Sequence, residues 1–240
     1  MRLDQYITEK LQITRNKSQA IIKAGNVFIN GEKIIKTGFE IKESMEVIIN
    51  ELDETKYVAR SAVKLKGFLE NVENFKIENF ICLDIGSSTG GFCQILLEKN
   101  VKKIYAVDVG TSQLHSILRD NSKIISIENT DIRELPKIEG NLDLITCDVS
   151  FISLEMILDS IIFQMNKNTI SILLFKPQFE VGKKFINKKG VVIDEKISEK
   201  KLNDFLQICR DKGLQILKVE KSKLEGENGN KEVFVMIKRK

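Results

Sequence analysis

A glycine-rich turn that follows an aspartate could hold a charged cofactor against the main chain. The apolar run at residues 80–84 ends in Asp84 and predicts a strand, and residues 85–92 (Ile-Gly-Ser-Ser-Thr-Gly-Gly-Phe) lead from it into a predicted helix. Glycines in such a turn let a ligand approach the backbone closely. Two further aspartates, Asp108 and Asp131, each follow a later apolar run. In a parallel sheet these acids would meet at the edge where open α/β sheets bind ligands.

The spacing of the acids and glycines distinguishes between two cofactors. A dinucleotide-binding fingerprint would need glycine at Ser88, and Asp84 would repel a nearby pyrophosphate. The same carboxylate suits the ammonium group of a methionine moiety, while Asp108 can accept hydrogen bonds from both ribose hydroxyls and Asp131 could meet the adenine amino group. The pattern therefore favours S-adenosylmethionine over a nicotinamide cofactor. The predicted cofactor-binding residues are Asp84, Gly86, Ser88, Thr89, Gly90, Gly91, Phe92, Asp108 and Asp131.

A second pair of charged residues follows two later apolar runs. Asp148 comes after residues 144–147, and Lys176 comes after residues 170–175. Burying an ammonium group without a partner is costly, so a lysine directly after an apolar strand indicates that an acid lies nearby. Asp148 would be that acid if both strands end at the same edge of the sheet. The alternative is that the two residues belong to ordinary surface ion pairs.

The elements that would position these residues alternate between strands and helices. Apolar periodicity predicts strands near residues 80–84, 103–108, 123–128, 142–147, 169–175, 214–220 and 232–238. It predicts helices near residues 90–99, 112–119, 153–164 and 196–212. This alternation is typical of an α/β domain that has a mostly parallel, seven-stranded sheet with helices on both faces.

The beginning of the chain predicts a separate, small α+β unit. Helical spacing indicates a first helix from Leu3, and Thr14 can cap a second helix that Gly25 ends. An Asn-Gly pair at residues 30–31, between two apolar runs, predicts a hairpin. The predicted organisation is therefore residues 1–52 for the small unit, residues 53–63 for a linker and residues 64–240 for the α/β domain.

The small unit resembles an S4 domain, an RNA-binding module of ribosomal protein S4 and of several RNA-modifying enzymes. The resemblance rests on Arg2-Leu3-Asp4, on residues 15–25 and on the hairpin at residues 27–31. It implies that basic side chains on and before the second helix contact RNA phosphates. The predicted RNA contacts of this unit are Arg2, Arg15, Lys17 and Lys23.

Over its whole length the chain resembles the TlyA family, in which an S4 domain is fused to an FtsJ-like methyltransferase domain. The motifs that carry the resemblance are residues 84–92, residues 148–154 (Asp-Val-Ser-Phe-Ile-Ser-Leu), residues 176–180 (Lys-Pro-Gln-Phe-Glu), residues 190–192 and Gly229-Asn230-x-Glu232. The resemblance implies a Rossmann-like class I methyltransferase fold and methylation of a ribose 2′-hydroxyl, that of a cytidine, in ribosomal RNA. By motif position, the family's catalytic residues correspond to Lys64, Asp148, Lys176 and Glu232.

The resemblance also gives the lysines a chemical role. A ribose hydroxyl is a poor nucleophile, so it must lose or share its proton as it attacks the sulfonium methyl group. Lys176 could take that proton if burial and the second cation, Lys64, favour its neutral form, or it could stay charged and only position the oxygen. A cluster of lysines then follows Lys176, and it could hold RNA phosphates. The predicted RNA contacts of this domain are Arg60, Lys183, Lys184, Lys188 and Lys189.

Composition limits the other partners. The 240 residues have a net charge of +4, which neither requires nor excludes a nucleic acid. No apolar run reaches the roughly 18 residues that span a bilayer, and the polar N-terminus is unlike a signal peptide, so we expect a cytoplasmic protein without a membrane partner. Four scattered cysteines and one histidine lack the spacing of a metal site, so we expect no metal. We also expect a monomer.

Three classes of function follow from this reading. We expect a ribose methyltransferase that acts on ribosomal RNA or ribosomal subunits, whether small, large or both. The second class is a methyltransferase that acts on another RNA or on a target other than ribose. One that acts on a base, a protein or a small molecule would not need the Lys-Asp-Lys-Glu set, and the Asn/Asp-Pro-Pro-Phe/Tyr-like signature of base amino methylation is absent from the sequence. The third class is an RNA-binding or haemolysin-like protein without catalysis, but the sequence has no amphipathic cationic helix that would support lysis.

Overall fold

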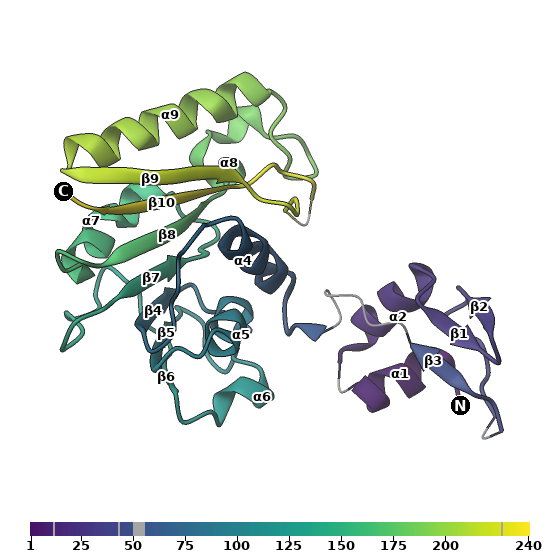
Figure 1. Cartoon of the computed structure of the whole chain (residues 1–240). Coiled ribbons are helices and arrows are strands. Elements are labelled where there is room, and N and C mark those ends of the chain that lie inside the picture. The colour runs from purple at the N-terminus through teal and green to yellow at the C-terminus, as the bar shows by residue number, and fades with distance from the viewer. Residues whose placement is uncertain (12, 43, 50–55, 227) are drawn as a thin grey trace. The chain divides into compact units, whose positions relative to one another are not determined.

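The chain forms two compact units in the computed structural model, Met1–Tyr57 and Val58–Lys240 (Figure 1). The structure describes residues 1–11, 13–42, 44–49, 56–226 and 228–240. Part of the predicted linker, residues 53–55, and the end of the predicted small unit, residues 50–52, lie outside the described residues. The last residues of the predicted linker, 60–63, form the first turn of a helix.

The first unit contains two helices and a small antiparallel sheet. The elements are α1 (Leu3–Leu11), α2 (Arg15–Lys23), β1 (Val27–Ile29), β2 (Glu32–Ile34) and β3 (Val47–Ile49), with strand order β2-β1-β3. The side chain of Thr14 accepts a hydrogen bond from the Lys17 amide, and Gly25 follows α2 with a φ of +76°. Both observations confirm the predicted ends of the second helix. The buried core consists of Leu3, Ile7, Ile21, Ile22, Val27 and Ile29.

The second unit is built on a seven-stranded sheet with the order β6-β5-β4-β7-β8-β10-β9. Its strands are β4 (Ile81–Ile85), β5 (Lys103–Val107), β6 (Ile124–Ile127), β7 (Leu144–Cys147), β8 (Ile170–Phe175), β9 (Leu214–Lys221) and β10 (Val233–Arg239). Only β10 runs antiparallel to both of its neighbours, and the strands from β6 to β8 are parallel. The predicted seven-stranded, mostly parallel sheet is therefore confirmed.

Helices cover this sheet. They are α4 (Arg60–Glu70), α5 (Gly91–Glu98), α6 (Ser116–Arg119), α7 (Leu154–Gln164), α8 (Pro177–Glu180) and α9 (Glu195–Asp211), and a 3₁₀ turn, η1 (Lys183–Phe185), follows α8. The predicted helices near residues 90–99, 153–164 and 196–212 are confirmed. The helix predicted at residues 112–119 is shorter, because it begins only at Ser116, and α4 was not predicted.

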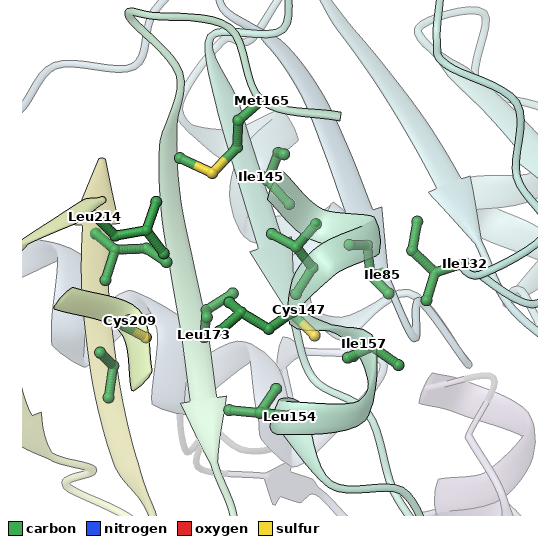
Figure 2. Close-up of a cluster of buried hydrophobic side chains, with 14 of the residues drawn as sticks. Ile85, Ile132, Ile145, Cys147, Leu154, Ile157, Met165, Leu173, Cys209 and Leu214 are labelled. Carbon is green, nitrogen blue, oxygen red and sulfur yellow. The ribbon is translucent and has the colours of Figure 1, made fainter. Parts of the chain in front are cut away.

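Strand β10 shows how the two faces of the sheet are covered. Phe234 stacks on Phe68 of α4, with ring centroids 4.7 Å apart, and on Phe92 of α5, at 6.2 Å. The next residue, Val235, points to the opposite face, because side chains alternate along a strand. There it joins a buried cluster to which α7 and α9 contribute, and Figure 2 shows part of this cluster, including Cys209 of α9.

The strand order places the carboxyl ends of the parallel strands around a crevice. The chain passes from β4 to β5 and β6 on one side and then returns to β7 and β8 on the other side of β4. Open α/β sheets bind ligands at such a reversal of strand order. Asp108 directly follows β5, Asp148 follows β7 and Lys176 follows β8. The structure therefore confirms that these residues lie at one edge of the sheet.

Candidate active site

A first cavity, of about 440 Å³, lies at the carboxyl ends of β4, β5, β6 and β7. Four of the predicted cofactor-binding residues line it, namely Gly86, Ser88, Asp108 and Asp131. Its wall also contains apolar side chains, among them Val109, Ile132 and Ile157. A cavity with a few polar groups on an otherwise apolar wall is typical of a cofactor site.

The two acids of this cavity are held by their neighbours. Asp108 accepts hydrogen bonds from the amides of Ser88, at 2.8 Å, and Gly110, at 2.7 Å, one on each carboxylate oxygen. Each oxygen keeps a lone pair, so the carboxylate can still accept from two adjacent hydroxyls. Arg133 donates to both oxygens of Asp131, at 3.0 and 2.6 Å, and these bonds lower the pKa of Asp131. The two carboxylates are hydrogen-bond acceptors, and this set of acceptors fits an adenosine with a free ribose diol.

The structure places Asp84 differently from the prediction. Its side chain is fully buried and accepts hydrogen bonds from Thr146 Oγ1, at 2.6 Å, and from Cys93 Sγ, at 3.1 Å. Because β4 continues to Ile85, Asp84 lies within the strand and not at its end. Asp84 is not part of the cavity lining, and its contact with the ammonium group of the cofactor stays a prediction.

The end of the glycine-rich turn, Thr89 to Phe92, also lies outside the cavity lining, and its contact with a cofactor stays a prediction. A Cβ atom on Gly90 would lie 2.3 Å from the side chain of Leu118, and one on Gly91 would lie 2.1 Å from Ser61 Oγ. These two glycines therefore allow α5 to pack closely against α6 and α4. Phe92 is buried in the aromatic stack with Phe234.

Burial of Asp84 predicts a distinctive dependence of stability on pH. Burial raises the pKa of this carboxyl to about 6, whereas an unfolded aspartate has a pKa of about 3.9. Between these values the folded protein binds the proton more tightly, so stability falls as pH rises toward 6 and then levels off. Asp84→Asn removes this titration and can still accept from Thr146. The gain in its free energy of unfolding over wild type should grow to roughly 2 to 3 kcal/mol between pH 4 and 7.

Thermal or denaturant unfolding of both proteins across this pH range measures that difference. The subtraction cancels the titration of groups that the two proteins share. A difference that stays constant from pH 4 to 7 would show that the Asp84 carboxyl does not titrate in this window.

Gly86 lines the first cavity beside Asp148, which lines the same cavity. Its φ is +76°, and a Cβ atom at this position would lie 2.8 Å from the carbonyl oxygen of Asp148. Both the backbone conformation and the close approach of Asp148 therefore require glycine. The close approach seen here is that of the segment after β7, and the approach of a ligand to this turn stays a prediction.

A second cavity, of about 600 Å³, adjoins the first. Ser150 and Phe151 line both cavities. The remaining wall comes from α4, from the segments that follow β8 and from the residues that precede β10: Arg60, Lys64, Lys176, Gln178, Phe179, Ile186, Gly190, Asn228, Asn230 and Glu232. Three of the four predicted catalytic residues are in this wall, and the fourth, Asp148, lines the first cavity.

The four predicted catalytic residues form two ion pairs. Lys176 Nζ lies 2.7 Å from Asp148 Oδ1, and Lys64 Nζ lies 2.6 Å from Glu232 Oε2. None of the four side chains is more than 13% exposed, so the alternative of surface ion pairs does not hold. Buried ion pairs contribute little net stability because desolvation offsets their attraction, so a cluster of them in a cavity points to chemistry.

Three residues that contact the ion pairs or line the same cavity were not predicted as site residues. Ser150 Oγ accepts a hydrogen bond from Lys176 Nζ at 3.0 Å, and Gln178 Nε2 donates to Glu232 Oε1 at 3.2 Å. Asn230 accepts from the Val192 amide at 3.0 Å and donates to the carbonyl of Gly190 at 2.9 Å. All three lie inside the motifs of the sequence, but nothing in their residue types distinguishes them from neighbouring polar residues.

The predicted RNA contacts of the second unit are exposed. Arg60 begins α4 and lines the second cavity. Lys183 and Lys184 are on η1, and Lys188 and Lys189 are in the turn that follows it. Asn230 ties the end of this segment to the start of β10, so the lysines are held near the cavity that the same segment lines.

The predicted RNA contacts of the first unit have different surroundings. Arg2 and Arg15 both form ion pairs with the buried Asp4. Lys17, on α2, donates a hydrogen bond to the carbonyl of Tyr57. Lys23 is exposed at the end of α2.

Two further features concern only the residues that the structure describes. Among these residues, no group of three or more histidine, cysteine, aspartate or glutamate side chains is arranged to hold a metal ion. No helix in this part of the chain is long and apolar enough to cross a membrane.

Comparisons with known proteins agree with this geometry. Residues 57–239 match the FtsJ-like methyltransferase family, and residues 1–47 match the S4 domain. A Campylobacter jejuni protein named 23S rRNA (cytidine-2′-O)-methyltransferase TlyA is 44% identical over 98% of both chains. A Mycobacterium tuberculosis protein named 16S/23S rRNA (cytidine-2′-O)-methyltransferase TlyA is 32% identical over 99% of this chain and 89% of its own.

A solved structure agrees as well. It comes from Streptococcus thermophilus, is described as a candidate hemolysin, and superposes with a TM-score of 0.76 at 33% identity. The match covers 100% of this chain and 88% of that chain. The chain therefore belongs to the TlyA family of FtsJ-like methyltransferases that carry an S4 domain at their N-terminus.

Proposed function

We propose that this protein transfers a methyl group from S-adenosylmethionine to the 2′-hydroxyl of a cytidine in ribosomal RNA. The observation that carries the proposal is the Lys176–Asp148 ion pair, which joins the two cavities. The first cavity suits an adenosine, and the wall of the second has the cations that a nucleotide would need. Methyl donor and acceptor oxygen would meet where the cavities adjoin.

The first cavity would hold the cofactor through residues that it already orients. Asp108 would accept hydrogen bonds from the ribose hydroxyls, and Asp131 would lie near the adenine amino group, with Val109 and Ile132 as apolar neighbours. When bound, S-adenosylmethionine supplies an electrophilic methyl group. The protein then has to bring one hydroxyl oxygen to that methyl group with the correct alignment, which can account for much of the rate.

Lys176 is the residue that would hold the acceptor hydroxyl. Asp148 and Ser150 fix its amine from two sides, so that a nitrogen with hydrogen-bonding capacity faces the second cavity. This amine either accepts the hydroxyl proton as the oxygen attacks, or donates a hydrogen bond that positions the oxygen. Lys64, paired with Glu232, adds a second cation on the wall of the same cavity.

Phe151 has the placement expected of a stacking surface for the target base. Its side chain is 92% exposed although it lines both cavities, and its φ is +66°, a strained value for a residue other than glycine. The ring lies 5.2 Å from that of Phe179. An exposed aromatic ring on a strained turn costs stability, so its presence between the cavities supports a role in binding a base.

Removing this ring is expected to weaken RNA methylation without weakening the fold. Phe151→Ala should lower kcat/KM for RNA about 10- to 100-fold, because stacking of a base on an aromatic ring contributes about 1 to 3 kcal/mol. Phe151→Gly should lose the same activity and also raise stability by roughly 1 kcal/mol, since glycine adopts the positive φ without strain. Steady-state kinetics and thermal unfolding check the two effects.

Phe163→Ala is the matched control, because Phe163 is also an exposed aromatic residue, on α7, but lines neither cavity. It should methylate RNA at the rate of wild type. Unchanged kinetics in both Phe151 variants would remove the ring from the mechanism.

The substrate follows from the names of the relatives. The Campylobacter protein is named for 23S rRNA alone and is the more similar of the two, so we propose the large ribosomal subunit. We also propose that the protein acts in the cytoplasm, where its ribosomal substrate would be, and that it acts as a monomer, since the residues of both cavities come from one chain. The test supplies labelled S-adenosylmethionine with purified small or large subunits that lack the modification. Label in the large subunit is expected, and label in neither subunit would refute the ribosomal substrate.

A further inference from the structure

We infer that Asp4 is a positioning residue for RNA binding, because it fixes the guanidinium groups of Arg2 and Arg15 as one site for backbone phosphates. The inference rests on the proposed function in taking RNA as the ligand. It concerns the first unit alone, and it assigns to a buried acid a role in binding a polyanion.

The contacts of Asp4 are unusually many for one carboxylate. Its side chain is 0% exposed. Arg2 donates to both oxygens, from Nε at 3.0 Å and from Nη2 at 3.1 Å, and Arg15 Nε donates at 3.0 Å. Gln19 Nε2 and the amide of Gln5 also donate, each at 3.0 Å. These hydrogen bonds keep the carboxylate charged, and the bond from Arg2 is the largest cause that holds the pKa of Asp4 well below its usual range.

The backbone of Asp4 is held as firmly as its side chain. Thr8 Oγ1 donates to the Asp4 carbonyl at 2.7 Å, and Ser18 Oγ of α2 donates to the same oxygen at 2.9 Å. Asp4 therefore lies where α1 and α2 contact each other, and both arginines are near the helix starts, Arg2 just before α1 and Arg15 at the first residue of α2. The two guanidinium groups are thereby anchored to one point of the unit.

The outer edges of both guanidinium groups face away from Asp4. The side chains of Arg2 and Arg15 are 49% and 59% exposed. Asp4 engages Nε and Nη2 of Arg2 but only Nε of Arg15. Its contacts thus leave Nη1 of Arg2 and both terminal nitrogens of Arg15 for another acceptor. A planar guanidinium with such an edge binds phosphate oxygens in a bidentate manner.

The charge balance favours a binding role over a purely structural one. One cation would neutralise the buried carboxylate, yet two are present, so the cluster carries a net positive charge at the surface. Each arginine has already lost side-chain freedom in the free protein, so that cost does not fall on RNA binding. Gly38 makes room for this arrangement, because a Cβ atom there would lie 3.1 Å from Arg2 Nη1.

Substitution of Asp4 distinguishes a positioning role from simple electrostatic attraction, because the two predict opposite changes in the affinity for RNA. Asp4→Asn makes the protein one charge more positive, so attraction to RNA alone would tighten binding. If Asp4 orients the arginines, binding weakens instead.

Three further variants complete the comparison. Arg15→Lys keeps every charge but loses the planar guanidinium group. Gly38→Ala keeps all charged residues while crowding Arg2. Glu32→Gln, at an exposed residue of β2, is the control with the same charge change as Asp4→Asn.

The experiment measures binding of the full-length protein to unmodified large ribosomal subunits at several salt concentrations, together with methylation kinetics. We expect Asp4→Asn and Arg15→Lys to bind about tenfold more weakly or worse, with the loss in KM rather than kcat, and Gly38→Ala to weaken binding in the same direction. Glu32→Gln should bind as wild type or slightly more tightly. Thermal unfolding identifies any variant that fails to fold. If Asp4→Asn does not fold, Arg15→Lys provides the decisive comparison, because it leaves the buried Asp4 carboxylate with a cation.

Two outcomes contradict the inference in distinguishable ways. If wild type binds the subunits and Arg15→Lys and Gly38→Ala bind equally well, or if folded Asp4→Asn binds more tightly, Asp4 does not position an RNA site. If wild type binds neither subunits nor free ribosomal RNA, the proposed function fails and the inference fails with it.

Discussion

Replacing Lys176 with alanine is expected to slow methyl transfer by about 10³-fold or more, while cofactor and RNA still bind, since acid–base help alone typically contributes about 10²- to 10⁴-fold. The amine lies 2.7 Å from Asp148 and 3.0 Å from Ser150, where the two cavities adjoin. Its removal takes away the group that would contact the acceptor oxygen. Single-turnover kinetics with labelled cofactor and saturating subunits measure the loss, and calorimetry checks cofactor binding.

A second substitution at this position separates the two chemical roles of the amine. Arginine keeps a permanent positive charge but cannot accept a proton. Lys176→Arg should be as inactive as Lys176→Ala if the lysine acts as a base, and it should retain part of the activity if the lysine only positions the oxygen. Lys167→Ala, an exposed lysine before the amino end of β8, is the control and should behave as wild type. Near-normal turnover in Lys176→Ala would contradict the assignment of the site.

Gly86→Ala should reduce cofactor binding and methyl transfer by roughly 100-fold, the loss that a displacement of about 1 Å at a reacting centre can cause. The added Cβ atom would lie 2.8 Å from the Asp148 carbonyl and 3.1 Å from Val149 Cγ1, so the backbone beside the first cavity must shift. The same movement would displace the carboxylate that holds Lys176. Calorimetry with S-adenosylmethionine and single-turnover kinetics measure the two losses.

Gly140→Ala provides the matched control for this prediction. Gly140 has a φ of +90°, so alanine there causes similar backbone strain, but a Cβ atom would meet no atom within 4 Å. We expect this variant to lose roughly 1 kcal/mol of stability and to keep wild-type cofactor binding. Equal losses of binding in both variants would assign the effect to backbone strain and not to the contact with Asp148.

The residues that follow parallel strands could be located from the sequence alone. Apolar runs mark the strands, and in an α/β sheet the carboxyl ends of parallel strands meet at one edge. Asp108, Asp148 and Lys176 were placed correctly for this reason. Asp84 was predicted to end its strand, but β4 continues by one residue to Ile85, because apolar runs define the ends of a strand less well than its interior.

Helix α4 was not predicted, because a functional residue interrupts the apolar periodicity of its sequence. Lys64 occupies a buried position of this helix, where periodicity would require an apolar side chain, and Gly67 interrupts it further. Local rules commonly fail at functional sites for this reason.

The Lys64–Glu232 pair joins residues 168 positions apart. No periodicity links residues so distant, so only the family resemblance placed them together.

The most direct test of the central claim is to determine which atom of the RNA receives the methyl group. Large subunits that lack the modification are incubated with the protein and labelled S-adenosylmethionine, and the nucleosides are then analysed by mass spectrometry with cleavage of the glycosidic bond. We predict a methylated cytidine whose label stays with the ribose fragment and which is absent with Lys176→Ala. Label on the base fragment, or no transfer to RNA although the cofactor is bound, would contradict the proposal that Lys176 presents a ribose hydroxyl to the methyl group.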